Sequence, residues 1–168
     1  MSPHMSQGSD PDIWPACAFQ IGAELRRNPG RIGLIVDDPL GKLMGAFAEV
    51  LGVSVSRADG CLLTPYAAGD PGQVIDRLVT LGNLITDLDV LFWKPWLSLD
   101  PLGIIRQVSR RRPGILFSWP GTVHDGHASY SAPGRRDFFE APITDALVLC
   151  PRVTTFPDEP PYQIERIA

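Results

Sequence analysis

Residues 32–43 read Ile32-Gly33-Leu34-Ile35-Val36-Asp37-Asp38-Pro39-Leu40-Gly41-Lys42-Leu43, and this stretch decides the fold. An apolar run leads through a short loop into a helical pattern, as in the phosphate-binding motif GxxxxGK[ST]. In that motif the first glycine lets the backbone curl around phosphates, the lysine reaches the terminal phosphates and the hydroxyl holds magnesium. Gly41 and Lys42 match the motif. Val36 replaces its first glycine and Leu43 replaces its hydroxyl residue, so the loop is degenerate.

These departures weaken nucleotide binding in three ways. The branched side chain of Val36 resists the backbone conformation in which amides converge on phosphate. Leu43 offers no oxygen ligand to Mg²⁺. Asp37 and Asp38 place negative charge on the path of a triphosphate, and one like-charge pair about 4 Å apart costs roughly 4 kcal/mol at an effective dielectric near 20. Lys42 offsets only part of that cost, and we therefore expect no efficient ATP hydrolysis.

Strands and helices alternate along the rest of the chain. Helices are expected at 16–27, from the loop to Gly52, after Asp70-Pro71 and from Asp100-Pro101 to Pro113, and strands at 32–36, 53–56, within 84–92, at 115–119 and at 145–150. This alternation predicts an α/β three-layer sandwich with a mostly parallel sheet. Asp125-Gly126 predicts a β-hairpin insertion near 122–131, because both residues accept the positive φ of a type I′ turn.

The composition indicates one ordinary globular domain. The chain has 168 residues, of which 44% are hydrophobic and 20% charged. We expect a disordered segment at 1–13, a single domain at 14–152 and a proline-rich tail at 153–168. No secretory signal or membrane span is apparent, and Cys17, Cys61 and Cys150 are few and scattered, so a cytoplasmic protein is expected. The net charge of −4 argues against a protein dominated by nucleic-acid binding.

A series of less common residues follows in the second half of the chain. It comprises Pro95-Trp96-Leu97-Ser98-Leu99-Asp100-Pro101-Leu102, Ser109-Arg110-Arg111-Arg112, Trp119-Pro120-Gly121, Gly126-His127, Tyr130 and Pro133-Gly134. The stretch from Trp93 to Phe139, covering about a third of the chain, resembles the BrxF family, small P-loop-containing proteins of type 3 BREX bacteriophage-exclusion systems. That family has an intact Walker A motif where this chain has the degenerate loop at 36–43.

The resemblance implies a P-loop NTPase-like fold and a place in an antiviral defence system. The partners that it implies are a large ATPase, a DNA methyltransferase and an alkaline-phosphatase-like protein. Together with the degenerate loop, it leads us to expect an accessory subunit without efficient ATP hydrolysis and without a cofactor. A homo-oligomer remains open.

The competing hypothesis is an ATPase that is active within a complex, with ATP and Mg²⁺ as cofactors. Gly41 and Lys42 would bind the nucleotide, and Lys42 and Asp87 would be catalytic. Asp87 follows the apolar run Leu84-Ile85-Thr86, as a Walker B carboxylate would. Each residue also has a simpler interpretation, Lys42 as a surface lysine and Asp87 as a solvated strand-end or capping residue.

Two further clusters are candidates for contacts with partners. Arg110, Arg111 and Arg112, with Arg106, are either helix-end charges, a DNA contact or an arginine finger toward a partner's nucleotide. Trp93 and Trp96 are either protein-contact anchors or locally packed, since tryptophan is enriched in interfaces. His124 and His127 flank the predicted hairpin turn, and we expect no metal there because no third ligand is visible.

Overall fold

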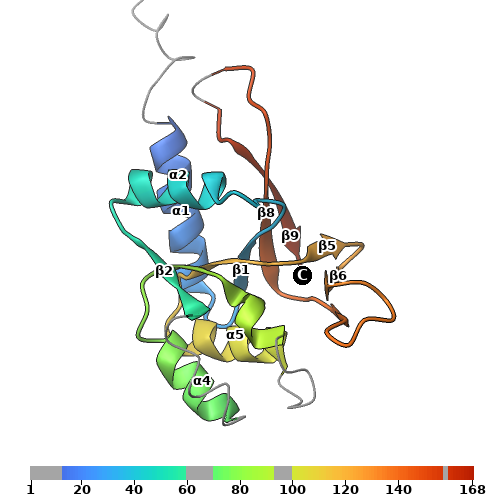
Figure 1. Cartoon of the computed structure of the whole chain (residues 1–168). Coiled ribbons are helices and arrows are strands. Elements are labelled where there is room, and N and C mark those ends of the chain that lie inside the picture. Colours follow the sequence, from blue (N-terminus) through green and yellow to red (C-terminus); the bar gives the residue numbers. More distant parts are fainter. Residues whose placement is uncertain (1–12, 60–69, 93–99, 157–158) are drawn as a thin grey trace, which may run out of the picture.

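The computed structural model describes residues 13–59, 70–92, 100–156 and 159–168 (Figure 1). We predicted a disordered segment at 1–13, and residues 1–12 of it lie outside the described part. The helices are α1 (Ile13–Arg27), α2 (Lys42–Leu51), α4 (Pro71–Leu78) and α5 (Pro101–Arg111), with a 3₁₀ helix at Leu88–Phe92. The strands are β1 (Ile32–Ile35), β2 (Val55–Arg57), β3 (Leu84–Thr86), β4 (Leu116–Ser118), β5 (Thr122–His124), β6 (His127–Tyr130), β7 (Phe139–Pro142), β8 (Ala146–Pro151) and β9 (Tyr162–Ile167).

The main sheet has six strands in the order β2-β3-β4-β1-β8-β9. Every pair in it is parallel except β8–β9, which is antiparallel. The predicted α/β class with a mostly parallel sheet is therefore confirmed. β1 lies between β4 and β8, so the loop that follows it leaves the middle of the sheet.

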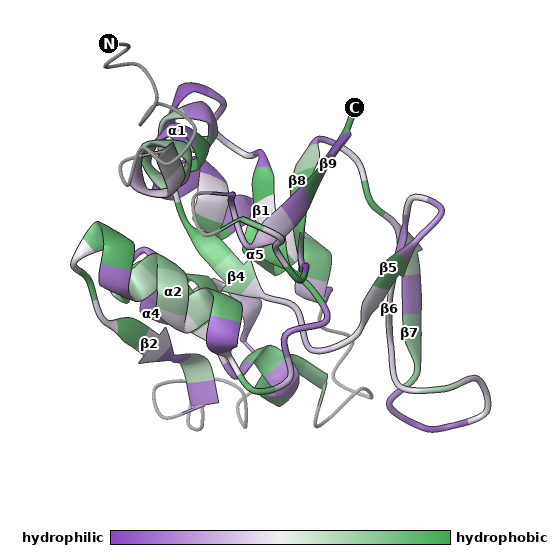
Figure 2. Ribbon diagram, turned by 90° about the horizontal axis from the view of Figure 1, so that it is seen from above, coloured by the Kyte–Doolittle hydropathy of each residue, from purple (hydrophilic) through white to green (hydrophobic). Residues whose placement is uncertain are grey.

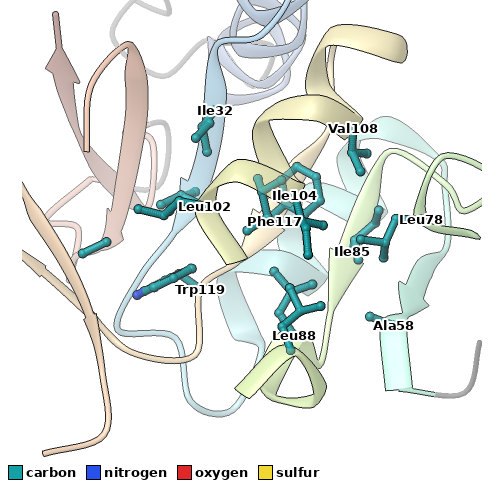
Figure 3. Packing of buried hydrophobic residues seen from close by; sticks show 14 of the residues in the cluster. Ile32, Ala58, Leu78, Ile85, Leu88, Leu102, Ile104, Val108, Phe117 and Trp119 are labelled. Atoms are coloured by element: carbon teal, nitrogen blue, oxygen red, sulfur yellow. The ribbon is translucent and has the colours of Figure 1, made fainter. Parts of the chain in front are cut away.

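Helices cover both faces of this sheet, as a three-layer sandwich requires (Figure 1). Side chains of α1 and α2 pack with Ile35, Leu84 and Leu147 in one buried cluster. Side chains of α4 and α5 pack with Ile32 and Leu34 in the other. Figure 3 shows this second core, in which residues of β1, β3 and β4 meet those of α4 and α5. The alternation of Ile32, Leu34 and Ile35 between two buried faces follows from the period of two in a strand.

Gly33 lets α1 approach the centre of the sheet. A Cβ atom built on Gly33 would lie 2.8 Å from Cδ1 of Leu25 and 3.1 Å from the carbonyl oxygen of Ile115. Any side chain at this position would collide with the helix above the sheet and with the neighbouring strand. The glycine is therefore explained by packing.

A second, three-stranded antiparallel sheet, β5-β6-β7, is inserted after β4. Its first hairpin turns at Asp125 (φ 49°) and Gly126 (φ 72°), as the sequence predicts. The indole Nε1 of Trp119 donates a hydrogen bond to the carbonyl of Ser129, and the rings of Phe92 and Tyr130 stack with centroids 3.9 Å apart. These contacts fix the small sheet beside the carboxyl end of β4.

Three strands differ from the sequence prediction. β7 was not predicted, and it extends the predicted hairpin to a three-stranded sheet. β2 covers 55–57, later than the predicted 53–56, because Val53 belongs to the turn after the Gly52 cap of α2. β9 lies within the segment 153–168 that we predicted as a tail, and it pairs with β8 along its whole length. Figure 2 shows hydrophobic residues concentrated in central strands such as β1, whereas β9 at the edge contains both hydrophobic and hydrophilic residues.

Among the described helices, none combines the length and apolar character needed to cross a bilayer.

Candidate functional site

A cleft of about 420 Å³ opens at the carboxyl ends of β1, β3 and β4. Three connections line it, and their lining residues are Asp37, Asp38, Pro39 and Gly41 after β1, Thr86, Asp87 and Asp89 at β3, and Ser118, Trp119, Pro120 and Gly121 at β4. Open parallel sheets bind ligands at this end of their strands. We call this site the acidic cleft, because four of its side chains are carboxylates.

The carboxylate of Asp38 occupies the N-terminus of α2. Its Oδ1 accepts a hydrogen bond from the backbone N–H of Leu43, and its Oδ2 accepts one from Met44, each at 3.0 Å. The chain turns back before the helix, since the N–H of Gly41 donates to the carbonyl of Asp38 and Gly41 has φ 68°. The helix amides that would face a phosphate are therefore bound to the chain's own carboxylate.

Lys42 lies outside the cleft. It is the first residue of α2 and is exposed, and it does not belong to the cleft lining, whereas Gly41 does. Within the described ranges, Lys42 has no hydrogen-bond or ion-pair partner. The structure thus brings Gly41 and Asp87 to the same cleft and leaves Lys42 on the surface of the helix.

Asp87 directly follows β3 at the cleft, and its backbone is in the left-handed region with φ 61°. Its Oδ2 lies 2.6 Å from Nε of Arg57, which comes from the end of the adjacent strand β2. Arg57 also contacts Asp59 at 3.1 Å, and the hydrogen bond to Asp59 with the charges of both carboxylates raises the pKa of its guanidinium. The candidate Walker B carboxylate is therefore paired with an arginine of the chain itself.

The other two carboxylates contact neutral groups. Oδ2 of Asp37 lies 3.7 Å from Sγ of Cys150, and burial together with this carboxylate raises the pKa of the thiol. Asp89 accepts a hydrogen bond of 3.4 Å from the hydroxyl of Tyr130. Burial first, and then the charge of Asp89, raises the pKa of Tyr130. Two aspartates thus add negative charge to the cleft, and no cationic side chain of the described residues pairs with either of them.

The arrangement favours a cation over a polyphosphate, but it does not form a metal centre. No group of three or more histidine, cysteine, aspartate or glutamate side chains within the described ranges is arranged to hold a metal ion. His124 and His127 lie at the exposed tip of the hairpin, where His124 contacts Asp125 at 3.2 Å. Neither histidine lines the cleft.

The arginine cluster lies at the other end of the sheet. It forms the last turn of α5, which leads into the amino end of β4, whereas the cleft is at the carboxyl end. Arg111 pairs with Asp76 of α4 at 2.5 Å, and Arg112 donates to the carbonyl of Gly82 at 2.5 Å. Burial lowers the pKa of Arg112. Arg110 is exposed, so it is the member of the three best placed to meet a partner.

The sequence predicted two site residues that the structure does not describe and missed others that it does. Trp93 and Trp96 lie outside the described residues. Sequence reasoning missed the capping role of Asp38 and the presence of Trp119 in the cleft, whereas Asp89, the second candidate for a Walker B carboxylate after Asp87, does line it. The role of Asp38 had a sequence signal, because an aspartate shortly before a helix stabilises the positive end of that helix.

Comparison with protein-family models, curated proteins and solved structures finds no match to this chain.

Proposed function

We propose that this chain is a P-loop-fold accessory subunit that binds ATP poorly, does not hydrolyse it efficiently and works beside other proteins of a BREX-like antiviral system. The observation that carries the loss of nucleotide chemistry is the pair of 3.0 Å hydrogen bonds from the amides of Leu43 and Met44 to Asp38. The defence context rests on the resemblance to the BrxF family.

The sheet supports descent from a P-loop fold. The degenerate loop follows a central parallel strand, β1, and the Walker B-like Asp87 follows β3. One strand, β4, separates the two. Because one fold hosts many functions, the conclusion on activity depends on the site.

The site disfavours a triphosphate through competition. A phosphate oxygen and the Asp38 carboxylate would need the same two N–H donors, and the carboxylate belongs to the chain, so it does not dissociate. Displacing it would leave a charged group in the cleft beside Asp37 and Asp89. For scale, one pair of like charges about 4 Å apart costs roughly 4 kcal/mol at an effective dielectric near 20.

The site also departs from the Walker motifs at the two positions that hold magnesium. Leu43 stands where the motif has its hydroxyl, and the carboxylate of Asp87 is paired with Arg57. Mg²⁺ binds through carboxylates and phosphates with several of its own waters. A nearby guanidinium competes for the one carboxylate in the Walker B-like position. Both departures argue against metal-assisted hydrolysis by this chain alone.

Calorimetric titration of the purified chain with ATP, with and without Mg²⁺, tests the proposal. We expect no saturable heat at micromolar nucleotide. Low-micromolar, magnesium-dependent binding that is lost in Lys42→Ala would overturn it. For the defence context, co-expression with a large ATPase and a DNA methyltransferase encoded beside the gene, followed by affinity purification, should yield a complex; if the chain purifies alone, that context is wrong.

A second candidate function is an ATPase completed by a neighbouring subunit. It is favoured by one observation, that Gly41 and Asp87 line the same cleft. An assembled complex would then hydrolyse ATP, and Asp87→Asn in this chain would abolish the turnover. Turnover that survives Asp87→Asn belongs to another subunit.

A further inference from the structure

A groove of about 610 Å³ runs between α1 and the edge strand β9. From α1 it is lined by Cys17, Gln20, Ile21, Glu24 and Arg27, and from the β8–β9 region by Arg152, Pro160, Tyr162, Gln163, Ile164 and Arg166. The α1 residues recur at intervals of three and four, so they form one stripe of the helix. The groove shares no residue with the acidic cleft.

The free edge of β9 faces this groove. β9 is the last strand of the six-stranded order, with β8 as its neighbour among the described residues. Tyr162, Gln163 and Ile164 all line the groove although successive side chains of a strand point to opposite faces. Three consecutive lining residues therefore place the groove along the backbone edge, where unpaired N–H and C=O groups can receive another strand.

The charge of the groove is positive, in a chain whose net charge is −4. It contains three arginines, Arg27, Arg152 and Arg166, against one carboxylate. That carboxylate, Glu24, is already paired with Arg166 at 3.1 Å and with Arg31 at 3.3 Å. The hydrogen bond from Arg166 lowers the pKa of Glu24 despite its partial burial.

Two of the three arginines keep charge available for a ligand. Arg27 is exposed and has no ion-pair partner within the ranges that the structure describes. Arg152 donates from Nε to the carbonyl of Pro160 at 3.1 Å, a contact that holds the side chain in the groove without neutralising it.

Exposed apolar side chains lie in the connection that follows Arg152 of the groove. Val153 and Phe156, in the connection between β8 and β9, are 99% and 59% exposed. Figure 1 shows this connection extending beyond the end of the sheet. Apolar anchors beside a polar rim are typical of protein contacts. A free strand edge and cationic flanks thus occur together, and exposed apolar side chains follow in the adjoining connection.

We propose that an extended acidic segment of a partner protein adds to β9 as the next strand, with its carboxylates against Arg27 and Arg152 and its apolar side chains against Val153 and Phe156. Main-chain pairing supplies affinity in this mode and side-chain pockets supply selectivity. The inference gives the proposed accessory role its partner chemistry. The proposed function and this inference can be refuted independently, because nucleotide titration tests the acidic cleft whereas peptide binding tests the groove.

Fluorescence anisotropy with a labelled eight-residue peptide of alternating glutamate and threonine tests the charge. The peptide should bind the full chain at low salt, and a lysine–threonine peptide should not. The variant Arg27→Glu/Arg152→Glu should bind at least about tenfold more weakly. Arg135→Glu/Arg136→Glu makes the same change in net charge on the loop before β7 and should leave affinity within about twofold. Equal losses in the two variants would overturn the proposal.

Hydrogen exchange in the same complex tests strand addition. The peptide should slow exchange of backbone amides in 162–167, and circular dichroism of both variants should match that of the parent chain. Binding that leaves β9 exchange unchanged would reduce the groove to a nonspecific basic surface and refute strand addition. If β9 is instead protected by a second copy of the chain, sedimentation will show a concentration-dependent dimer, and the acidic partner is then wrong.

Discussion

The Nε of Arg57 lies 2.6 Å from Oδ2 of Asp87, so an ion pair joins the carboxyl ends of the adjacent parallel strands β2 and β3. These residues are far apart in the sequence, and the strand pairing of Arg57 with Thr86 brings them together. The pair turns a candidate metal-binding carboxylate into a partner of the protein's own cation. It also bears on the cost of substituting Asp87.

We predict that Asp87→Ala destabilises the fold more than Asp87→Asn. Asn loses the charge but tolerates the observed φ of 61°, whereas Ala loses the charge and adds strain of about 1 kcal/mol. The ion pair itself is exposed, so its loss contributes little, roughly 0–1 kcal/mol. Urea unfolding of the two variants measures the difference. Equal midpoints would show that the backbone conformation at Asp87 carries no cost.

Removing the Asp38 carboxylate should weaken the start of α2. Asp38→Ala leaves the amides of Leu43 and Met44 without their acceptor, and lost N-terminal caps cost about 1 kcal/mol. Hydrogen exchange at these two amides should accelerate as well. Glu49→Ala is the control, because Glu49 is exposed near the other end of the same helix. The cap interpretation fails if exchange at 43 and 44 is unchanged.

Two glycines should respond oppositely to alanine. Gly33→Ala places a methyl group 2.8 Å from Leu25 in the interior and should destabilise by about 1–3 kcal/mol. Gly45→Ala meets nothing within 4 Å and lies within α2, so it should stabilise by about 0.5–1 kcal/mol. Thermal unfolding of both variants checks the signs. A neutral Gly33→Ala would mean that α1 can move away from the sheet at little cost.

Sequence periodicity predicted the elements whose signals are local. The Asp70-Pro71 helix start is one example, since Asp70 accepts a hydrogen bond from the N–H of Gln73 as a cap should. The Asp125-Gly126 hairpin is another. β9 was missed because its sequence, Tyr-Gln-Ile-Glu-Arg-Ile, follows a proline-rich connection and becomes a strand only by pairing with β8.

The candidate site was predicted only in part for the same reason. The loop after β1 and the carboxylate after β3 can be located from local patterns, and both line the cleft. The direction of the Lys42 side chain and the Arg57–Asp87 contact cannot, because they depend on helix orientation and strand order. The arginine cluster gave a clear composition signal, but its position at the opposite end of the sheet is a property of topology.

The final prediction concerns alkaline pH and Tyr162. Its side chain is 6% exposed, in edge contact with the Trp14 ring and beside that of Phe47, and burial raises the pKa of its hydroxyl from 10.0 to about 12. A raised pKa means that the folded state holds the proton more tightly than the unfolded state. The resulting stability is complete below pH 10 and is lost as the pH rises toward 12, by up to roughly 2 kcal/mol.

Tyr162→Phe isolates this effect, because it keeps the ring contacts and removes the titrating group. The free energy of unfolding of the parent chain, measured between pH 8 and about pH 12, should fall more steeply than that of the variant above pH 10. Below pH 10 the two curves should run parallel, since the hydroxyl is neutral in both states of the parent chain. Parallel curves over the whole range would mean that the Tyr162 hydroxyl reaches water in the folded protein.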